Sequence, residues 1–255
     1  MQLDPKVSAL FVYNSYCMIR TIMEEEGENL KMIDVKGLLF DLDGVIVDTA
    51  KYHYLAWKEL ADMRNIPFTA EDNERLKGVS RMKSLEIILE IGGVKLSEEE
   101  KEQCCRIKNE IYLQYIQKLK EEEVLPGVKK FLADARERGY KIALGSASKN
   151  AVEILSRLKL MEAFDAIIDG TKVKKAKPDP EVFLLGAKEL ELDREACIVF
   201  EDARAGIEAA HNGGMKAVGI GTKDNLPNAE VCIPGLYYMT IDELKKELMA
   251  SKILS

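Results

Sequence analysis

The stretch VKGLLFDLDGVIVDTA, residues 35–50, combines an apolar run with two closely spaced aspartates. It opens with the apolar run VKGLLF, which is typical of a buried strand. Two carboxylates, Asp41 and Asp43, follow where that strand is expected to end. Because side chains alternate along a strand, residues two apart share one side, and a buried carboxylate without a partner is costly. The pair therefore requires a cation, a role in proton transfer or contact with water.

Strand-like and helix-like segments alternate along most of the chain. Short apolar runs predict strands at 35–43, 141–148, 164–170, 196–202, 216–221 and 231–234. From residue 128 onward, helical patterns such as AVEILSRLKL and AGIEAAHNGG lie between these runs. Alternating strands and helices predict an α/β fold, a parallel sheet with helices on both faces. Ligands of such folds lie outside the carboxyl ends of the strands.

Residues 51–124 interrupt this alternation, because their patterns are helical throughout and include no strand. We therefore expect a helical cap domain at 51–124, inserted into a core domain made of 35–50 and 125–255. The connections near 48–52 and 122–126 would act as hinges, so that the cap closes over the strand ends.

Residues 1–34 stand apart as an N-terminal appendage. Loosely helix-spaced apolar residues are followed by the polar run EEEGEN, which is typical of a linker. Met32 offers an alternative start just before the first strand, which would leave most of this segment untranslated.

Composition and charge indicate a cytoplasmic globular protein. The 255 residues carry a net charge of -7, which argues against a nucleic-acid or anionic membrane partner. No apolar run approaches the roughly 18 residues of a membrane span, and no secretory signal is recognisable. An odd number of cysteines without a C-x-x-C pair is typical of reduced thiols: Cys17, Cys104, Cys105, Cys197 and Cys232. We expect a monomer.

Polar groups gather at the predicted strand ends. They are Asp41 and Asp43 after the first strand, Ser146 and Ala147 after the second, Lys177 after the third, and Glu201 and Asp202 at the end of the fourth. Phosphoryl transfer needs such a set: a nucleophile, a cation, donors for the phosphoryl oxygens and an acid/base. Hard oxygen ligands without His or Cys favour Mg²⁺.

Each group has an expected role in that chemistry. Asp41 is predicted to be the nucleophile, and Asp43 the general acid/base. Ser146, the Ala147 backbone N–H and Lys177 are expected to hold the phosphoryl group. Among the neighbouring lysines, the KP-x-P spacing picks Lys177. The expected metal ligands are Asp41, Asp43, Glu201 and Asp202.

The order of these motifs resembles that of the haloacid-dehalogenase-like (HAD) superfamily of aspartate-dependent phosphotransferases. Within it, FDLDGVIVDTAKYHYLAWKELA, LKGVSR, ALGSASKN, AKPDPEVF and FEDARAGIEAA resemble the β-phosphoglucomutase family nearly end to end from Met32. The resemblance implies a Rossmann-like core, a four-helix cap and Mg²⁺. It also implies interconversion of β-D-glucose 1-phosphate and D-glucose 6-phosphate through an aspartyl-phosphate and β-D-glucose 1,6-bisphosphate.

The same motifs imply further contacts to the sugar phosphate. These residues are Thr49, His53, Trp57, Gly78, Val79, Ser80, Arg81, Lys108, Ser148, Lys149 and Asn150. Arg81 suits the distal phosphate, because a planar guanidinium grips two oxygens at once. Without the resemblance, His53 would be a helix-start histidine and Trp57 a core residue. Lys83 departs from the pattern, which has an acidic residue at its position.

Two other functions use the same residues. A sugar-phosphate phosphatase would form the same phosphoenzyme on Asp41, but water rather than a sugar hydroxyl would reach it. A non-catalytic sugar-phosphate sensor would bind a partner through the appendage. The presence of both Asp41 and Asp43 argues against the sensor.

Overall fold

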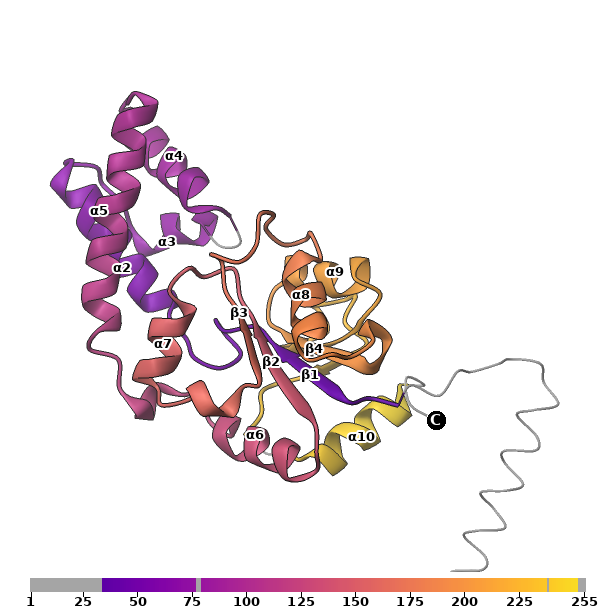
Figure 1. The fold of residues 1–255 in the computed structure, drawn as a ribbon. Helices are drawn as coiled ribbons and strands as arrows, with labels where there is room; N and C mark the ends of the chain where they lie inside the picture. Colours follow the sequence, from indigo (N-terminus) through magenta and orange to yellow (C-terminus); the bar gives the residue numbers. More distant parts are fainter. Residues whose placement is uncertain (1–33, 77–78, 238, 252–255) are drawn as a thin grey trace, which may run out of the picture. The chain divides into compact units, whose positions relative to one another are not determined.

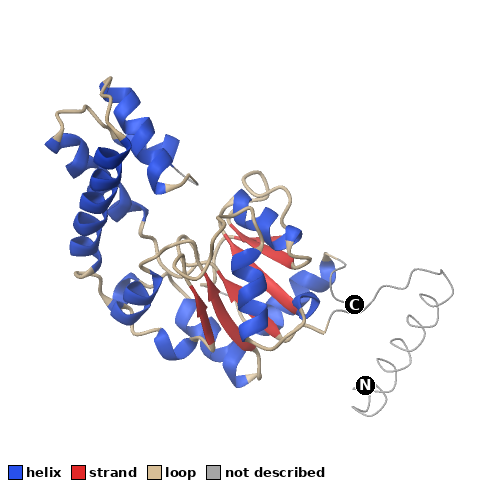
Figure 2. Cartoon of the chain, turned by 45° about the horizontal axis from the view of Figure 1, so that its top comes forward, coloured by secondary structure: helices blue, strands red, loops and turns tan. Residues whose placement is uncertain are grey.

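A computed structural model describes residues 34–76, 79–237 and 239–251. Within them, six parallel strands form one sheet in the order β3-β2-β1-β4-β5-β6 (Figures 1 and 2). The strands are β1 (Gly37–Phe40), β2 (Lys141–Gly145), β3 (Ala166–Ile168), β4 (Cys197–Glu201), β5 (Lys216–Ile220) and β6 (Val231–Ile233). Each lies inside one predicted run, so the α/β class and the parallel sheet are confirmed.

Helices cover both faces of the sheet, as the apolar runs require. The helices α8 (Glu181–Glu189) and α9 (Arg204–Asn212) pack on one face, over buried residues that include Leu39. On the other face Phe40 stacks on Phe200, with ring centroids 4.5 Å apart, and meets Phe131. Phe131 belongs to α6 (Val128–Glu137), against which α10 (Ile241–Ala250) packs. Neighbouring residues of β1 thus face opposite cores.

Four α-helices lie between β1 and α6, in the part of the chain that was predicted to be helical (Figure 1). They are α2 (Ala50–Met63), α3 (Ala70–Asn73), α4 (Arg81–Gly92) and α5 (Glu98–Ile116). They enclose an apolar core of their own, which includes Trp57, Leu60 and Leu85. The acidic run at the start of α5 has a structural role, because Ser97 and Glu100 form a capping box there.

The two connections between these helices and the sheet run side by side. Val47 forms an isolated antiparallel bridge with Val124, and the Leu125 backbone N–H donates to the Ile46 carbonyl at 2.9 Å. The two segments that connect the inserted helices to the sheet, although far apart in sequence, therefore pass next to each other. This is the arrangement that paired hinges need.

The predicted N-terminal appendage falls, apart from Asp34, outside the described residues, and so does Gly78. No described helix is both long and apolar enough to cross a membrane. The cysteines of the described part, Cys104, Cys105, Cys197 and Cys232, are free thiols.

Between β2 and β3 the chain forms the short helix α7 (Ala151–Arg157).

Candidate active site

Asp41 and Glu201 lie next to each other because their strands are neighbours. Phe40 at the end of β1 pairs with Phe200 of β4, and the Asp41 backbone N–H donates to the Phe200 carbonyl at 2.9 Å. Lys177 reaches both carboxylates: its Nζ is 2.6 Å from Asp41 Oδ1 and 2.7 Å from Glu201 Oε2. Burial by itself would lower the pKa of Lys177, but the two carboxylates outweigh burial and raise it.

Three acids form a cluster suited to a divalent cation. Oxygen atoms of Asp41, Glu201 and Asp202 all lie within 4.8 Å of one another. Burial raises the pKa of Glu201, against the opposing effect of Lys177, and burial together with Asp41 raises the pKa of Asp202. One lysine balances only one of three carboxylates. A divalent cation would supply the two missing positive charges, and the all-oxygen donor set suits such an ion.

Asp43 is not part of that cluster, although it was among the predicted ligands. Its carboxylate accepts a hydrogen bond from the Thr49 hydroxyl, which is fully buried at the start of α2. Burial and the negative charge of Asp41 raise the pKa of Asp43 to about 7. A carboxyl with this pKa exchanges protons near neutrality, so its placement suits an acid/base better than a metal ligand.

The loop after β2 folds back on itself beside this cluster. The Ser146 hydroxyl, 1% exposed, accepts from the Ser148 backbone N–H at 3.1 Å. The Ser148 hydroxyl in turn accepts from the Asn150 backbone N–H at 3.3 Å. The side chains of Ala147 and Lys149 are exposed on the same loop. The predicted phosphate-binding residues after β2 thus form one compact turn.

His53 and Lys108 meet between α2 and α5. The Lys108 Nζ is 2.8 Å from His53 Nδ1, and the His53 ring stacks on Tyr112 with centroids 4.2 Å apart. Burial, followed by the charge of Lys108, lowers the pKa of His53 to about 3. Burial, followed by the charge of Arg81, lowers that of Lys108 to about 7. Both shifts favour the uncharged forms of the two side chains, which share this hydrogen bond.

Trp57 lies in the core of the inserted helices. Its side chain is 3% exposed and belongs to their apolar cluster. The Lys108 ammonium lies over its ring, 5.0 Å from the centroid. Trp57 therefore supports Lys108 from within the core.

At the start of α4 the residues Val79 and Ser80 are exposed, and the Ser80 hydroxyl caps the helix by accepting from the Lys83 backbone N–H. The next residue, Arg81, donates from Nη2 to Asn109 Oδ1 at 2.9 Å. Lys83, the departure from the family pattern, pairs with a glutamate of its own helix. Of these residues, Arg81 is the one that the structure links to another part of the site.

Four residues of the site were missed by the sequence reasoning. Asn109 accepts from Arg81, and Tyr112 stacks on His53. A Cβ on Gly44 would lie 1.9 Å from Asp202 Oδ2, and one on Gly206 would lie 2.0 Å from the Glu201 carboxylate. A glycine inside the helical pattern RAGIEAAHN was a usable signal for Gly206.

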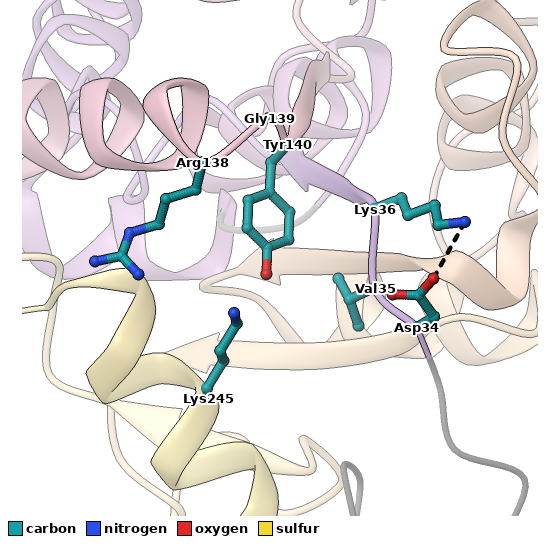
Figure 3. A pocket seen from close by; sticks show the side chains of 7 residues that line it. All are labelled: Asp34, Val35, Lys36, Arg138, Gly139, Tyr140 and Lys245. Carbon is teal, nitrogen blue, oxygen red and sulfur yellow. Dashed lines mark ion pairs between the residues drawn. The ribbon is translucent and has the colours of Figure 1, made fainter.

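A pocket at the opposite end of the sheet belongs to none of this chemistry. It is lined by residues that precede β1 and β2, together with Lys245 of α10 (Figure 3). Its charges are largely paired: Lys36 lies 3.1 Å from Asp34, and Arg138 holds Asp242 through two hydrogen bonds.

Comparison with known proteins settles the family. Residues 35–214 match the family model described as haloacid dehalogenase-like hydrolase. The chain belongs to this family. It is 43% identical over 215 residues to β-phosphoglucomutase of Bacillus subtilis, covering 84% of this chain and 95% of the relative. The three-acid cluster is the candidate site for a divalent metal in this chain.

Two further similar proteins have names that describe different activities. The crystal structure of a β-phosphoglucomutase from Clostridium difficile is 41% identical to this chain, with a TM-score of 0.78, covering 85% of this chain and 98% of that one. The phosphorylated carbohydrates phosphatase of Thermotoga maritima is 33% identical, covering 72% of this chain and 84% of that protein. This family member is thus most similar, of these three, to the two phosphoglucomutases.

Proposed function

We propose that this protein is a β-phosphoglucomutase, an enzyme that interconverts β-D-glucose 1-phosphate and D-glucose 6-phosphate. The observation that carries the proposal is the convergence of Arg81 and Asn150 on one side chain, Asn109, because a mutase has to hold a second phosphate away from the nucleophile. The 43% identity to the Bacillus enzyme over most of both chains supports the same activity.

The proposed reaction begins with Asp41 carrying a phosphoryl group. The group passes to the 6-hydroxyl of β-D-glucose 1-phosphate, while Asp43 takes the hydroxyl proton. The resulting β-D-glucose 1,6-bisphosphate turns round, and Asp41 attacks the phosphorus on C1. Asp43 returns the proton to the departing C1 oxygen, so D-glucose 6-phosphate leaves and Asp41 is phosphorylated again.

The remaining groups position the phosphates. Lys177, already held by Asp41, is suited to donate to the phosphoryl group in transfer together with Ser146 and the Ala147 backbone N–H. Asp41, Glu201 and Asp202 would hold Mg²⁺, which would offset negative charge on the reacting phosphoryl group. Thr49 holds Asp43 in place until substrate binds.

We assign residues 51–124 to a cap and residues 35–50 and 125–255 to a core in this mechanism. Closure of the cap would exclude water from the phosphoenzyme and bring Lys108 and Arg81 to the sugar phosphate. We further propose a cytoplasmic monomer that acts on free sugar phosphates and does not bind nucleic acid, in keeping with its net charge of -7 and its free thiols.

The second candidate is a sugar-phosphate phosphatase, favoured by the similarity to the Thermotoga phosphatase. One assay separates the two functions. Purified protein receives Mg²⁺, β-D-glucose 1-phosphate and a trace of the 1,6-bisphosphate, and glucose 6-phosphate and free phosphate are measured together. A mutase yields glucose 6-phosphate with little free phosphate. Mostly free phosphate overturns the proposal, and Asp41→Asn protein provides the blank.

A further inference from the structure

One carbonyl oxygen joins the cap helices to the core. Asn109 Oδ1, on α5, accepts from Arg81 Nη2 at 2.9 Å and from Asn150 Nδ2 at 3.1 Å. Arg81 opens α4, whereas Asn150 precedes α7 in the core. Because arginine can only donate, the amide oxygen of Asn109 must face it, and both donors therefore converge on that oxygen. An amide oxygen offers two lone pairs, and these two bonds use both.

The partner of Arg81 is neutral, and this has a consequence for binding. Among the described residues, no carboxylate lies within ion-pair distance of Arg81. Its charge nevertheless acts on the neighbourhood, since it lowers the pKa values of His53 and Lys108. A half-buried arginine held only by an amide keeps its charge available for an anion. One of its five N–H groups is used, so the rest of the guanidinium edge can grip a phosphate.

We propose that Asn109 is a positioning residue for the distal phosphate of the sugar bisphosphate. It orients the Arg81 guanidinium and the Asn150 amide toward one point, and so forms the phosphate site across the cap and the core before the ligand arrives. The inference rests on the proposed function for the identity of the ligand. Preorganisation of this kind improves affinity by removing the cost of ordering the binding groups.

The side chain at this position also has to be uncharged. An aspartate would have nearly the same shape and would still accept from both donors. However, its negative charge would pair with Arg81 and compete with the phosphate. Asn109→Asp should therefore weaken binding more than Asn109→Ala, although aspartate retains the hydrogen-bond acceptor.

The test measures binding without turnover. β-D-Glucose 1,6-bisphosphate is titrated by calorimetry into Asp41→Asn protein, which lacks the nucleophile, with and without Asn109→Ala. We expect the dissociation constant to rise about 10-fold, which corresponds to the free energy of roughly one hydrogen bond. Gln103→Ala removes an exposed amide from the same helix and should leave the constant unchanged.

Two further measurements separate positioning from a general structural role. With Asp41 intact, hydrolysis of p-nitrophenyl phosphate, which reacts at Asp41 and has no second phosphate, should be unaffected by Asn109→Ala. In protein that already carries Arg81→Ala, Asn109→Ala should lower bisphosphate affinity by less than about 2-fold. If Asn109 acts through Arg81, the effects of the two substitutions are not additive.

Unchanged or tighter bisphosphate binding by Asn109→Ala would overturn the inference. So would an equal loss in bisphosphate affinity and in the rate of p-nitrophenyl phosphate hydrolysis, or losses in affinity from Asn109→Ala and Arg81→Ala that simply add. The calorimetric test does not depend on the fate of the phosphoryl group. A protein that hydrolyses the sugar phosphate would refute the mutase proposal and still show whether Asn109 positions the distal phosphate.

Discussion

At the residue scale, Asp41 and Asp43 show how two identical side chains acquire different roles. Asp41 lies against Lys177 and two other acids, so its charged form is compensated. Asp43 has Thr49 as its hydrogen-bond partner, and burial together with the negative charge of Asp41 raises its pKa to about 7. In the proposed mechanism, environment rather than residue type would suit Asp41 to be the nucleophile and Asp43 to carry the proton.

Asp43→Asn should therefore slow the mutase reaction by roughly 10²–10⁴-fold, the usual cost of losing a general acid/base. Asparagine keeps the shape of the side chain and still accepts from Thr49, so the fold should be unaffected. Steady-state rates of glucose 6-phosphate formation measure the effect. Asp48→Asn alters an exposed acid nearby and should have no effect. A rate equal to that of the unaltered enzyme would remove Asp43 from proton transfer.

Lys108 is a buried lysine whose charged form costs the protein stability. Its side chain is 2% exposed, and burial lowers its pKa from 10.5 to about 7. Because the folded pKa lies below the unfolded one, the chain loses stability as pH falls from about 10.5 toward 7, and below 7 the loss is complete.

Lys108→Met should accordingly stabilise the protein, by roughly 1–3 kcal/mol at pH 6 and by less at pH 9. Methionine fills similar space without a charge, although the hydrogen bond to His53 is lost. Urea unfolding of both proteins at the two pH values measures the difference. Lys118→Met, at an exposed position just after α5, should show no such pH dependence. A stability difference that does not change with pH would contradict the assignment of a buried charge.

At the scale of elements, the three-acid cluster depends on how the chain passes from β4 into α9. Glu201 ends β4, and its carboxylate accepts from the Ala203 backbone N–H at 3.0 Å as the chain turns into the helix. Gly206, in the first turns of α9, leaves the space that this carboxylate occupies. The helix thus approaches the acid closely because one of its residues has no side chain.

Gly206→Ala should weaken Mg²⁺ binding by roughly 10- to 100-fold, since the new methyl group would push the Glu201 carboxylate away from Lys177 and the cluster. Alanine favours the helix, so the protein should remain folded. Calorimetric titration with Mg²⁺ measures the change. Gly213→Ala, at the other end of α9, serves as the control. Unaltered Mg²⁺ affinity in the Gly206 variant would show that Glu201 is not needed for the ion.

At the scale of the whole molecule, the proposed mechanism places the reacting groups on the core and the groups for the rest of the substrate on the inserted helices. Arg81 of α4 is joined to the core through Asn109 and Asn150. Binding energy from a remote phosphate can then drive closure of the cap, which assembles the reacting site.

Arg81→Ala should consequently lower mutase flux by about 10-fold or more, as expected for losing a charged hydrogen bond, and should spare hydrolysis of p-nitrophenyl phosphate. The two rates are compared in the same preparation. Arg106→Ala, an exposed position on α5, should change neither rate. Equal losses of both activities would place Arg81 outside the distal-phosphate site.

Part of the site could be predicted because it follows from the parallel arrangement of the strands. Parallel strands place their carboxyl ends along one edge, so acids after β1 and β4 meet there whatever the intervening sequence. The separation of Asp43 from Asp41, Glu201 and Asp202 could not be predicted this way. It depends on where Thr49 lies at the start of α2, which is a matter of packing.

The parallel sheet, the inserted helical segment and the meeting of the acids and Lys177 at the strand ends could all be predicted from the sequence. These follow from periodicity and chain order, which are local properties. Two contacts became visible only in the folded chain: Asn109 joins Arg81 to Asn150, and Gly206 makes room for Glu201. These contacts join residues whose distance is set by side-chain packing between elements, and no local pattern encodes that distance.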